Sequence, residues 1–126
     1  MPEGDDGRTW RIDVRDGIRW HDGKPFTAGD VAFTFRYYRD GVSNRWTHHI
    51  SDTPKLTSIE QLNGRSVRIR CQLPCPLFDR VTAADLVILP AHLWHSVDHP
   101  HLYHGAIVGT GPYRVSKHAP GRFLRL

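Results

Sequence analysis

Histidine is the residue type with the most evident chemical potential in this sequence. Five of the nine histidines fall within one short stretch, at His92, His95, His99, His101 and His104. Imidazole is the commonest metal ligand, and the spacing of His92 and His95 allows both to share a helical face. However, no His-Glu-x-x-His pattern is present, and Pro100 interrupts any continuous helix. A His-rich metal-binding module is therefore kept only as an alternative, and we expect no metal or other cofactor.

Nucleophilic and phosphate-binding chemistry find little support in the sequence. No serine lies in the Gly-x-Ser-x-Gly context in which a hydrolase presents its nucleophile. The tripeptide Gly109-Thr110-Gly111 has some likeness to a phosphate-binding loop, but it lacks the Lys-Ser/Thr ending and precedes a predicted strand rather than a helix. The residues alone predict no catalytic site, and we expect the protein not to be an enzyme.

The two cysteines, Cys71 and Cys75, are separated by three residues that include Pro74. Without a second cysteine pair this spacing does not indicate a zinc knuckle. A disulfide would require a sharp chain reversal, because the two Cα atoms must lie within about 7 Å. We therefore expect a buried free thiol at Cys71, with a disulfide as the alternative.

Length and charge place the chain among ordinary globular domains. Its 126 residues suffice for one domain, and 17 basic against 13 acidic residues give a formal net charge of +4. The arginines are scattered rather than clustered, which argues against nucleic-acid binding. The longest apolar run, residues 86–91, is too short to span a membrane, and the first seven residues do not resemble a signal peptide.

The elements that must position any site are predicted by local patterns. Alternation at Trp10, Ile12 and Val14 indicates a half-buried strand, and Asp16-Gly17 indicates a hairpin that returns through residues 18–20. Residues 27–30 form a capping box, in which the Thr27 hydroxyl accepts from the Asp30 amide and the Asp30 carboxylate accepts from the Thr27 amide. They open a helix that ends near Gly41.

Further along the chain, Asn63-Gly64 predicts a second hairpin between residues 58–62 and 65–73, with Leu73 on its buried face. We expect a short helix over residues 77–84, a helical turn opened by Pro90 at residues 91–94, and strands near residues 113–115 and 123–126. The predicted class is α+β, with a small mixed sheet built from hairpins, one capped helix and short helices.

Three blocks of sequence resemble the signature of the family 5 extracellular solute-binding proteins of ABC importers. The first runs from Asp5 to Phe35 and reads DDGRTWRIDVRDGIRWHDGKPFTAGDVAFTF. The second is ILPAHLW at residues 88–94, and the third is VGTGPYRV at residues 108–115. Their order and approximate spacing also match the family, so the resemblance covers essentially the whole chain.

This resemblance implies a non-enzymatic receptor that binds a peptide or similar polar solute between two lobes and delivers it to a membrane permease. Family members are several times longer, so we expect a fragment in which residues 1–108 form the small lobe and residues 109–126 return strands of the main lobe. The family also implies a periplasmic or extracytoplasmic location for the full-length parent, although a signal sequence is absent from this chain.

The resemblance also implies where solute contacts lie. In the family, the segment after the capped helix lines the cleft, and here it contains Arg45, Trp46 and His48. Trp46 offers a stacking face and Arg45 can bind a carboxylate through two hydrogen bonds. We expect these three residues and Tyr113 to be ligand-binding. We also expect the isolated chain to be marginally stable and to self-associate through the strands near residues 113–115 or 123–126.

Overall fold

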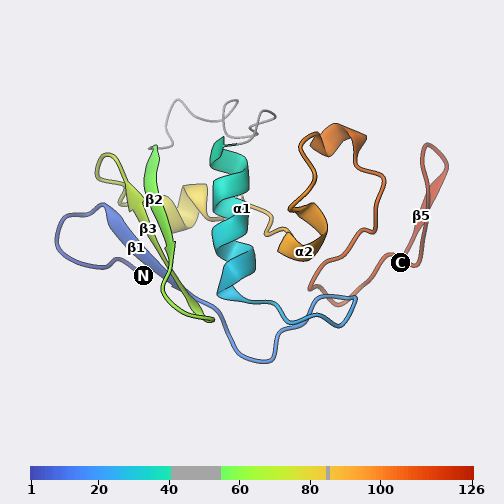
Figure 1. Cartoon of the computed structure of the whole chain (residues 1–126), viewed down its shortest axis with the longest axis horizontal. Helices are drawn as coiled ribbons and strands as arrows, with labels where there is room; N and C mark the ends of the chain where they lie inside the picture. Colours follow the sequence, from blue (N-terminus) through green and yellow to red (C-terminus); the bar gives the residue numbers. More distant parts are fainter. Residues whose placement is uncertain (41–54, 85) are drawn as a thin grey trace.

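A three-stranded antiparallel sheet forms one layer of the protein, as seen in a computed structural model that describes residues 1–40, 55–84 and 86–126. Its strands are β1 (Thr9–Asp13), β2 (Leu56–Gln61) and β3 (Ser66–Cys71). The strand order is β1-β3-β2, so β3 lies in the centre (Figure 1). The pairing is antiparallel throughout, so the α+β class is confirmed while the sheet is not mixed.

The two faces of this sheet differ in polarity because side chains alternate along each strand. Trp10 on β1 lies opposite Ile69 on β3, which in turn lies opposite Ile59 on β2, and all three are buried. On the other face, Arg68 lies opposite Arg11 and Glu60 and remains accessible. The pairing of β3 with β2 confirms the hairpin predicted at Asn63-Gly64.

Helix α1 (Ala28–Asp40) packs its apolar side against the sheet and buries Val31, Ala32 and Phe35 there. The predicted capping box is half confirmed. The Thr27 amide donates to Asp30 Oδ2 over 2.9 Å, but the Thr27 hydroxyl accepts from the Gly29 amide at 3.2 Å. The Asp30 amide instead donates to the Thr27 carbonyl, which accounts for the difference.

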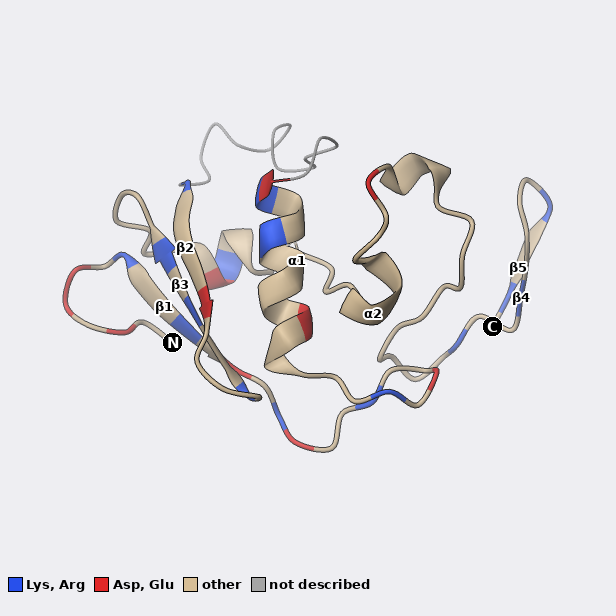
Figure 2. Ribbon diagram, viewed as in Figure 1, with Lys and Arg blue, Asp and Glu red and all other residues tan. Residues whose placement is uncertain are grey.

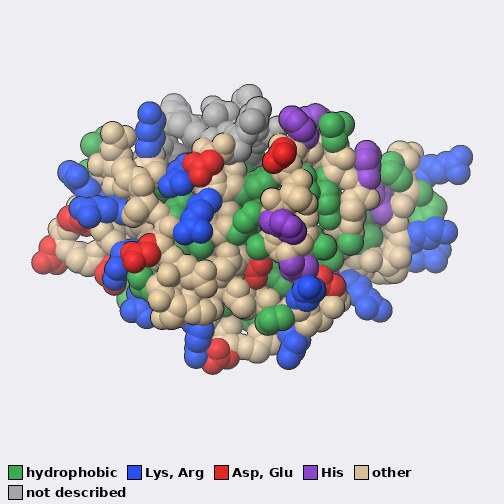
Figure 3. All heavy atoms as spheres, in the orientation of Figure 1, with side chains coloured by type: hydrophobic (Ala, Val, Ile, Leu, Met, Phe, Trp, Pro, Cys, Tyr) green, Lys and Arg blue, Asp and Glu red, His purple; other side chains and the backbone are tan. Residues whose placement is uncertain are grey.

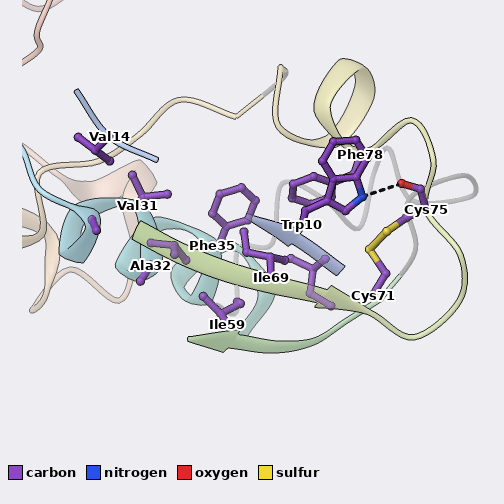
Figure 4. Close-up of a cluster of buried hydrophobic side chains, with 13 residues drawn as sticks. Trp10, Val14, Val31, Ala32, Phe35, Ile59, Ile69, Cys71, Cys75 and Phe78 are labelled. Carbon is purple, nitrogen blue, oxygen red and sulfur yellow. Dashed lines mark hydrogen bonds between the residues drawn. A yellow bond between two sulfur atoms is a disulfide. The ribbon is translucent and has the colours of Figure 1, made fainter. Parts of the chain in front are cut away.

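The core is completed by a short π-helix, η2 (Phe78–Thr82), at the position where a short helix is predicted. Phe78 is 5.6 Å from Trp10 and 5.8 Å from Phe35, measured between ring centroids, and all three rings are buried. The Trp10 indole donates to the Cys75 carbonyl at 3.1 Å, so its only polar group is satisfied inside the core (Figure 4).

Cys71 and Cys75 form a disulfide, so the expectation of a free thiol at Cys71 is wrong. The reason lies in residues 72–74, which reverse the chain after β3 and bring the two Cα atoms to 6.4 Å. The strand consequently ends at Cys71, and Leu73 is exposed rather than on the buried face. Both cysteines are buried at the end of the core (Figure 4).

The first predicted hairpin is also wrong. β1 pairs with β3 instead of residues 18–20, because that pairing places Trp10 against the apolar face of the central strand. The chain from Ile18 to Phe26 forms a small separate turn closed at Asp22-Gly23, in which Arg19 pairs with Pro25 and the Phe26 amide donates to the Ile18 carbonyl.

The remaining elements lie on the far side of α1 from the sheet (Figure 1). Pro90 opens helix α2 (Ala91–Trp94) as predicted, and a 3-10 turn, η3 (Pro100–Leu102), follows. The chain ends in a two-stranded antiparallel sheet of β4 (Lys117–Ala119) and β5 (Phe123–Arg125). Thus the strand predicted near residue 123 is present, whereas residues 113–115 form no strand. In the described part of the chain, we find no helix with the length and apolarity needed to cross a membrane.

Candidate functional site

The buried carboxylate of Asp30 connects parts of the chain that are distant in sequence. Its Oδ2 accepts from the Thr27 amide and from the Trp20 indole, the latter at 3.2 Å. Its Oδ1 accepts from the Ala91 amide at 2.9 Å. Asp30 is only 6% exposed, so three donors satisfy a charge that would otherwise be costly to bury. The first block of the sequence is thereby joined to the second.

Thr34 makes a parallel connection one turn further along α1. Its hydroxyl donates to the Asp30 carbonyl at 2.7 Å and accepts from the Leu89 amide at 2.9 Å. Thr34 is fully buried, so this hydroxyl fixes the segment before α2 against the helix. The short α2 therefore depends on side chains of α1 for its position.

His21 joins the first block to the third. Its Nδ1 accepts from the Gly109 amide at 3.1 Å, and its Nε2 lies 2.8 Å from the Gly111 carbonyl oxygen. The His21 amide also donates to the Gly109 carbonyl at 2.9 Å. Because Nδ1 accepts and Nε2 must donate, the imidazole is neutral with its proton on Nε2.

Asp22, the next residue, joins the same turn to α2. The His92 Nε2 donates to Asp22 Oδ2 at 2.5 Å, and the Lys24 amide donates to Asp22 Oδ1 at 3.1 Å. The hydrogen bond from His92 is the main cause that lowers the pKa of Asp22, and it outweighs the opposing desolvation. The Asp22 carboxylate is therefore engaged by the protein itself.

An open pocket of about 680 Å³ lies beside these contacts, and we call it the junction pocket. One wall comes from residues 103–108 and the other from residues 114–118 and Pro120, with His21 and Asp22 between them. This volume is within the range of small-molecule sites, roughly 300–1,000 Å³. The junction pocket is lined by residues of the first block (His21 and Asp22) and of the third block (Val108, Arg114 and Val115).

The lining of the junction pocket combines apolar and basic groups. Ile107, Val108 and Val115 supply apolar surface, while Arg114 and Lys117 supply positive charge. Asp22 is the acid among its described lining residues, and it is already bound by His92. Such a lining favours a ligand that carries a carboxylate or another anionic group on an apolar body.

The ligand-binding residues expected from the sequence are not assembled by the described structure. Arg45, Trp46 and His48 lie outside the described residues. Tyr113 is described and is 72% exposed; it directly precedes Arg114 but does not line the junction pocket.

The structure instead brings together His21, Asp22 and residues 109–118, of which the sequence assigned only Tyr113 to a site. The HDG and GTG tripeptides were the available signal, but nothing in either one shows that they meet across a sequence separation of 88 residues.

The histidine-rich stretch does not form a metal centre among residues 86–126. His92 binds Asp22, and the His95 Nδ1 donates to the Ala91 carbonyl of its own helix at 3.2 Å. The rings of His99 and His101 lie 5.8 Å apart in an edge-on arrangement. No group of three potential ligands is found in the described part of the chain. Figure 3 shows the histidines dispersed over one side of the surface.

The chain is similar in sequence to known proteins. Residues 3–126 match the sequence profile of the bacterial extracellular solute-binding proteins, family 5 Middle. A putative ABC transporter peptide-binding protein of Brucella ovis is 29% identical over 114 residues, which is 86% of this chain and 21% of the relative. The chain thus spans about a fifth of the length of such curated relatives.

Solved structures of similar proteins share the fold. The oligopeptide-binding protein AppA of Bacillus subtilis, solved with a nonapeptide, superimposes with a TM-score of 0.80 at 23% identity, over 98% of this chain and 25% of that one. NikZ of Campylobacter jejuni, solved with Ni(L-His), gives a TM-score of 0.73 at 30% identity, over 96% of this chain and 24% of that one.

Proposed function

The chain belongs to the family 5 bacterial extracellular solute-binding proteins, and we propose that it forms part of the substrate-binding component of an ABC importer. The observation that carries this proposal is the family match over residues 3–126 together with the fold shared with peptide-binding proteins. In this role the protein is a receptor that presents a solute to a membrane permease, and it performs no chemical step on that solute.

A peptide or similar polar solute is the proposed ligand class. The Brucella ovis relative is named as a peptide-binding protein, and AppA was solved with a nonapeptide. The junction pocket supports this class, because Arg114 and Lys117 can meet a peptide carboxylate while Ile107 and Val115 contact apolar side chains. The contacts expected at Arg45, Trp46, His48 and Tyr113 remain proposals.

The proposed organisation has a small lobe at residues 1–108 and strands of a main lobe at residues 109–126. Supporting this division, residues 109–111 are the point where the C-terminal segment binds the His21 turn, beyond which the chain forms the separate β4–β5 sheet. A solute would then be enclosed when the two lobes of the complete receptor close on it.

An extracytoplasmic location is part of the proposal. Family membership supports it, and so does the disulfide between Cys71 and Cys75, because such bonds persist in oxidising compartments and are rare in the cytosol.

The proposal is tested by titrating a panel of di- to pentapeptides into the isotopically labelled chain and following amide chemical shifts by NMR, which also detects weak binding. We expect the resonances of Val108, Val115 and residues 44–48 to move, while those of η2 stay unchanged. An Arg114→Gln variant should lose the response to free peptide carboxylates, and the matched Arg80→Gln variant in η2 should retain it. Silence across the whole panel, or equal shifts on η2, would refute the proposal.

A further inference from the structure

The contact between His21 and residues 109–111 depends on one protonation state. At Nδ1 the ring offers a lone pair to the Gly109 amide, and at Nε2 it offers a proton to the Gly111 carbonyl. Only the neutral imidazole with its proton on Nε2 provides one acceptor and one donor in these positions. The protonated ring carries a proton on both nitrogens, so Nδ1–H would point at the Gly109 N–H.

We propose that His21 is a positioning residue that fixes residues 109–111, and with them the junction pocket, only while its ring is neutral. Protonation replaces a hydrogen bond at Gly109 by two opposed donors, although the hydrogen bond from Nε2 to Gly111 can persist. The remaining backbone bond from the His21 amide to the Gly109 carbonyl must then hold this site. Protonation of His21 therefore loosens the Gly109 end of the contact, and this inference goes beyond the proposed function because it requires no solute.

Loosening this contact affects both walls of the junction pocket. Residues 109–113 are the link between the wall at residues 103–108 and the wall that begins at Arg114. Gly109 lies next to the His21 ring, and a Cβ added there would be in ordinary van der Waals contact with the ring Cε1 at 3.4 Å. A change at the ring is thus transmitted directly to the backbone that joins the two walls.

The charged and titratable groups around His21 act in the same direction, with one exception. Those on its own turn are Arg19, Asp22 and Lys24, and α2 contributes His92, which is bound to Asp22. The two pocket walls contribute His104, Arg114, Lys117 and His118. A proton on His21 would add positive charge beside Arg114 and Lys117 in the same lining, and their mutual repulsion would favour separation of the walls. Asp22 alone opposes this, and its carboxylate is shared with His92.

Replacing His21 by glutamine tests the two hydrogen bonds of the ring separately from its change of charge. In the His21→Gln variant, the carboxamide oxygen and nitrogen are bonded to one carbon, just as the two ring nitrogens of histidine are bonded to Cε1. The oxygen can accept from the Gly109 amide and the nitrogen can donate to the Gly111 carbonyl, and the group does not change charge with pH. His95→Gln is the matched control, because His95 bonds only within α2 in the described structure.

The test is NMR of the full chain between pH 7.5 and pH 5. Long-range proton–nitrogen spectra at pH 7.5 should place the His21 ring proton on Nε2. The hydrogen-exchange protection factor of the Gly109 amide should fall at least about tenfold as His21 takes up a proton in the wild type and in His95→Gln, but change less than about twofold in His21→Gln. A ring proton on Nδ1 at pH 7.5, or Gly109 protection that stays constant while His21 titrates, would overturn the proposal.

Discussion

The described residues up to Trp94, here called the N-terminal region, surround a hydrophobic core, whereas most side chains of residues 95–126 are exposed. The N-terminal region buries thirteen residues in one cluster and closes one end of it with a disulfide. The C-terminal segment instead exposes large apolar side chains at Leu102, Ile107, Tyr113, Phe123, Leu124 and Leu126. Burial therefore holds the first region together, and the second depends on a few polar and aromatic contacts.

The two regions also differ in charge. The C-terminal segment carries four basic side chains and one acidic one, so it supplies most of the net charge of +4. Figure 2 shows only basic residues on the β4–β5 hairpin, whereas both signs alternate over the sheet. On the sheet, basic residues are paired, as Arg68 is with Glu3 at 2.6 Å. Charges are thus balanced by ion pairs on the sheet, whereas the C-terminal segment carries an excess of positive charge.

Removing an aromatic ring from each region should give the largest contrast. Phe35→Ala leaves a cavity beside Phe78 and should lower the free energy of unfolding by about 3–5 kcal/mol. Phe123→Ala in β5, where the ring is 45% exposed, should cost less than about 1 kcal/mol. Urea denaturation followed by tryptophan fluorescence measures both, and equal losses would show that the two regions share one core.

Removing the carboxylate of Asp30 should cause the second-largest loss of stability. Asp30→Ala leaves buried donors at Trp20, Thr27 and Ala91 without an acceptor, and should cost about 3 kcal/mol. Asp79→Ala, an exposed acid in η2, is the matched control and should change stability by less than about 0.5 kcal/mol. If Asp30→Ala unfolded at the same urea concentration as the wild type, the connection between α1 and α2 would be less important than the geometry indicates.

The disulfide should contribute less, because it closes a short loop. Replacing both Cys71 and Cys75 by serine should lower stability by about 2 kcal/mol through the entropy of the unfolded chain. The reduced wild type should match this double variant, and amide exchange in β4 and β5 should not change in either. A loss of protection in those two strands would contradict the separation of the two regions.

The smallest effect concerns the exposed pair that ties the His21 turn to α2. His92→Ala should raise the pKa of Asp22 toward its ordinary 3.8, because the hydrogen bond from His92 is the main cause of the lowering. The folded-state pKa is depressed, so the contribution of this pair to stability is present above pH 3.8 and is lost as the pH falls through the lowered value. Carbon NMR of the Asp22 carboxyl measures the change, with His95→Ala as the control that should leave it unaltered.

Local signals predicted the parts of the fold that local interactions determine. The Asn63-Gly64 hairpin, the helix capped at Thr27 and the turn opened by Pro90 all depend on residues close in sequence. The pairing of β1 with β3 was missed because alternation shows that a strand has one buried face, but not which strand lies beside it.

The candidate site was harder to predict for the same reason. His21 and Gly109 each belong to a turn with an obvious local meaning, and their hydrogen bond arises only when the lobe has folded. The resemblance identified the family correctly, yet it gave no indication that side chains of the first block bind the other two. Those contacts could not be predicted from the sequence, because they depend on the path of α2 and of the segment that follows it.

The contrast between the two regions is tested most directly by residue-resolved hydrogen exchange over the whole chain at pH 7.5. Amides of β3 and α1 should exchange only through global unfolding, and those of β4 and β5 should exchange at least about a hundredfold faster, with Gly109 between the two groups. Uniform protection from β1 to β5 would contradict this picture and show that residues 95–126 fold as one cooperative unit with the N-terminal region.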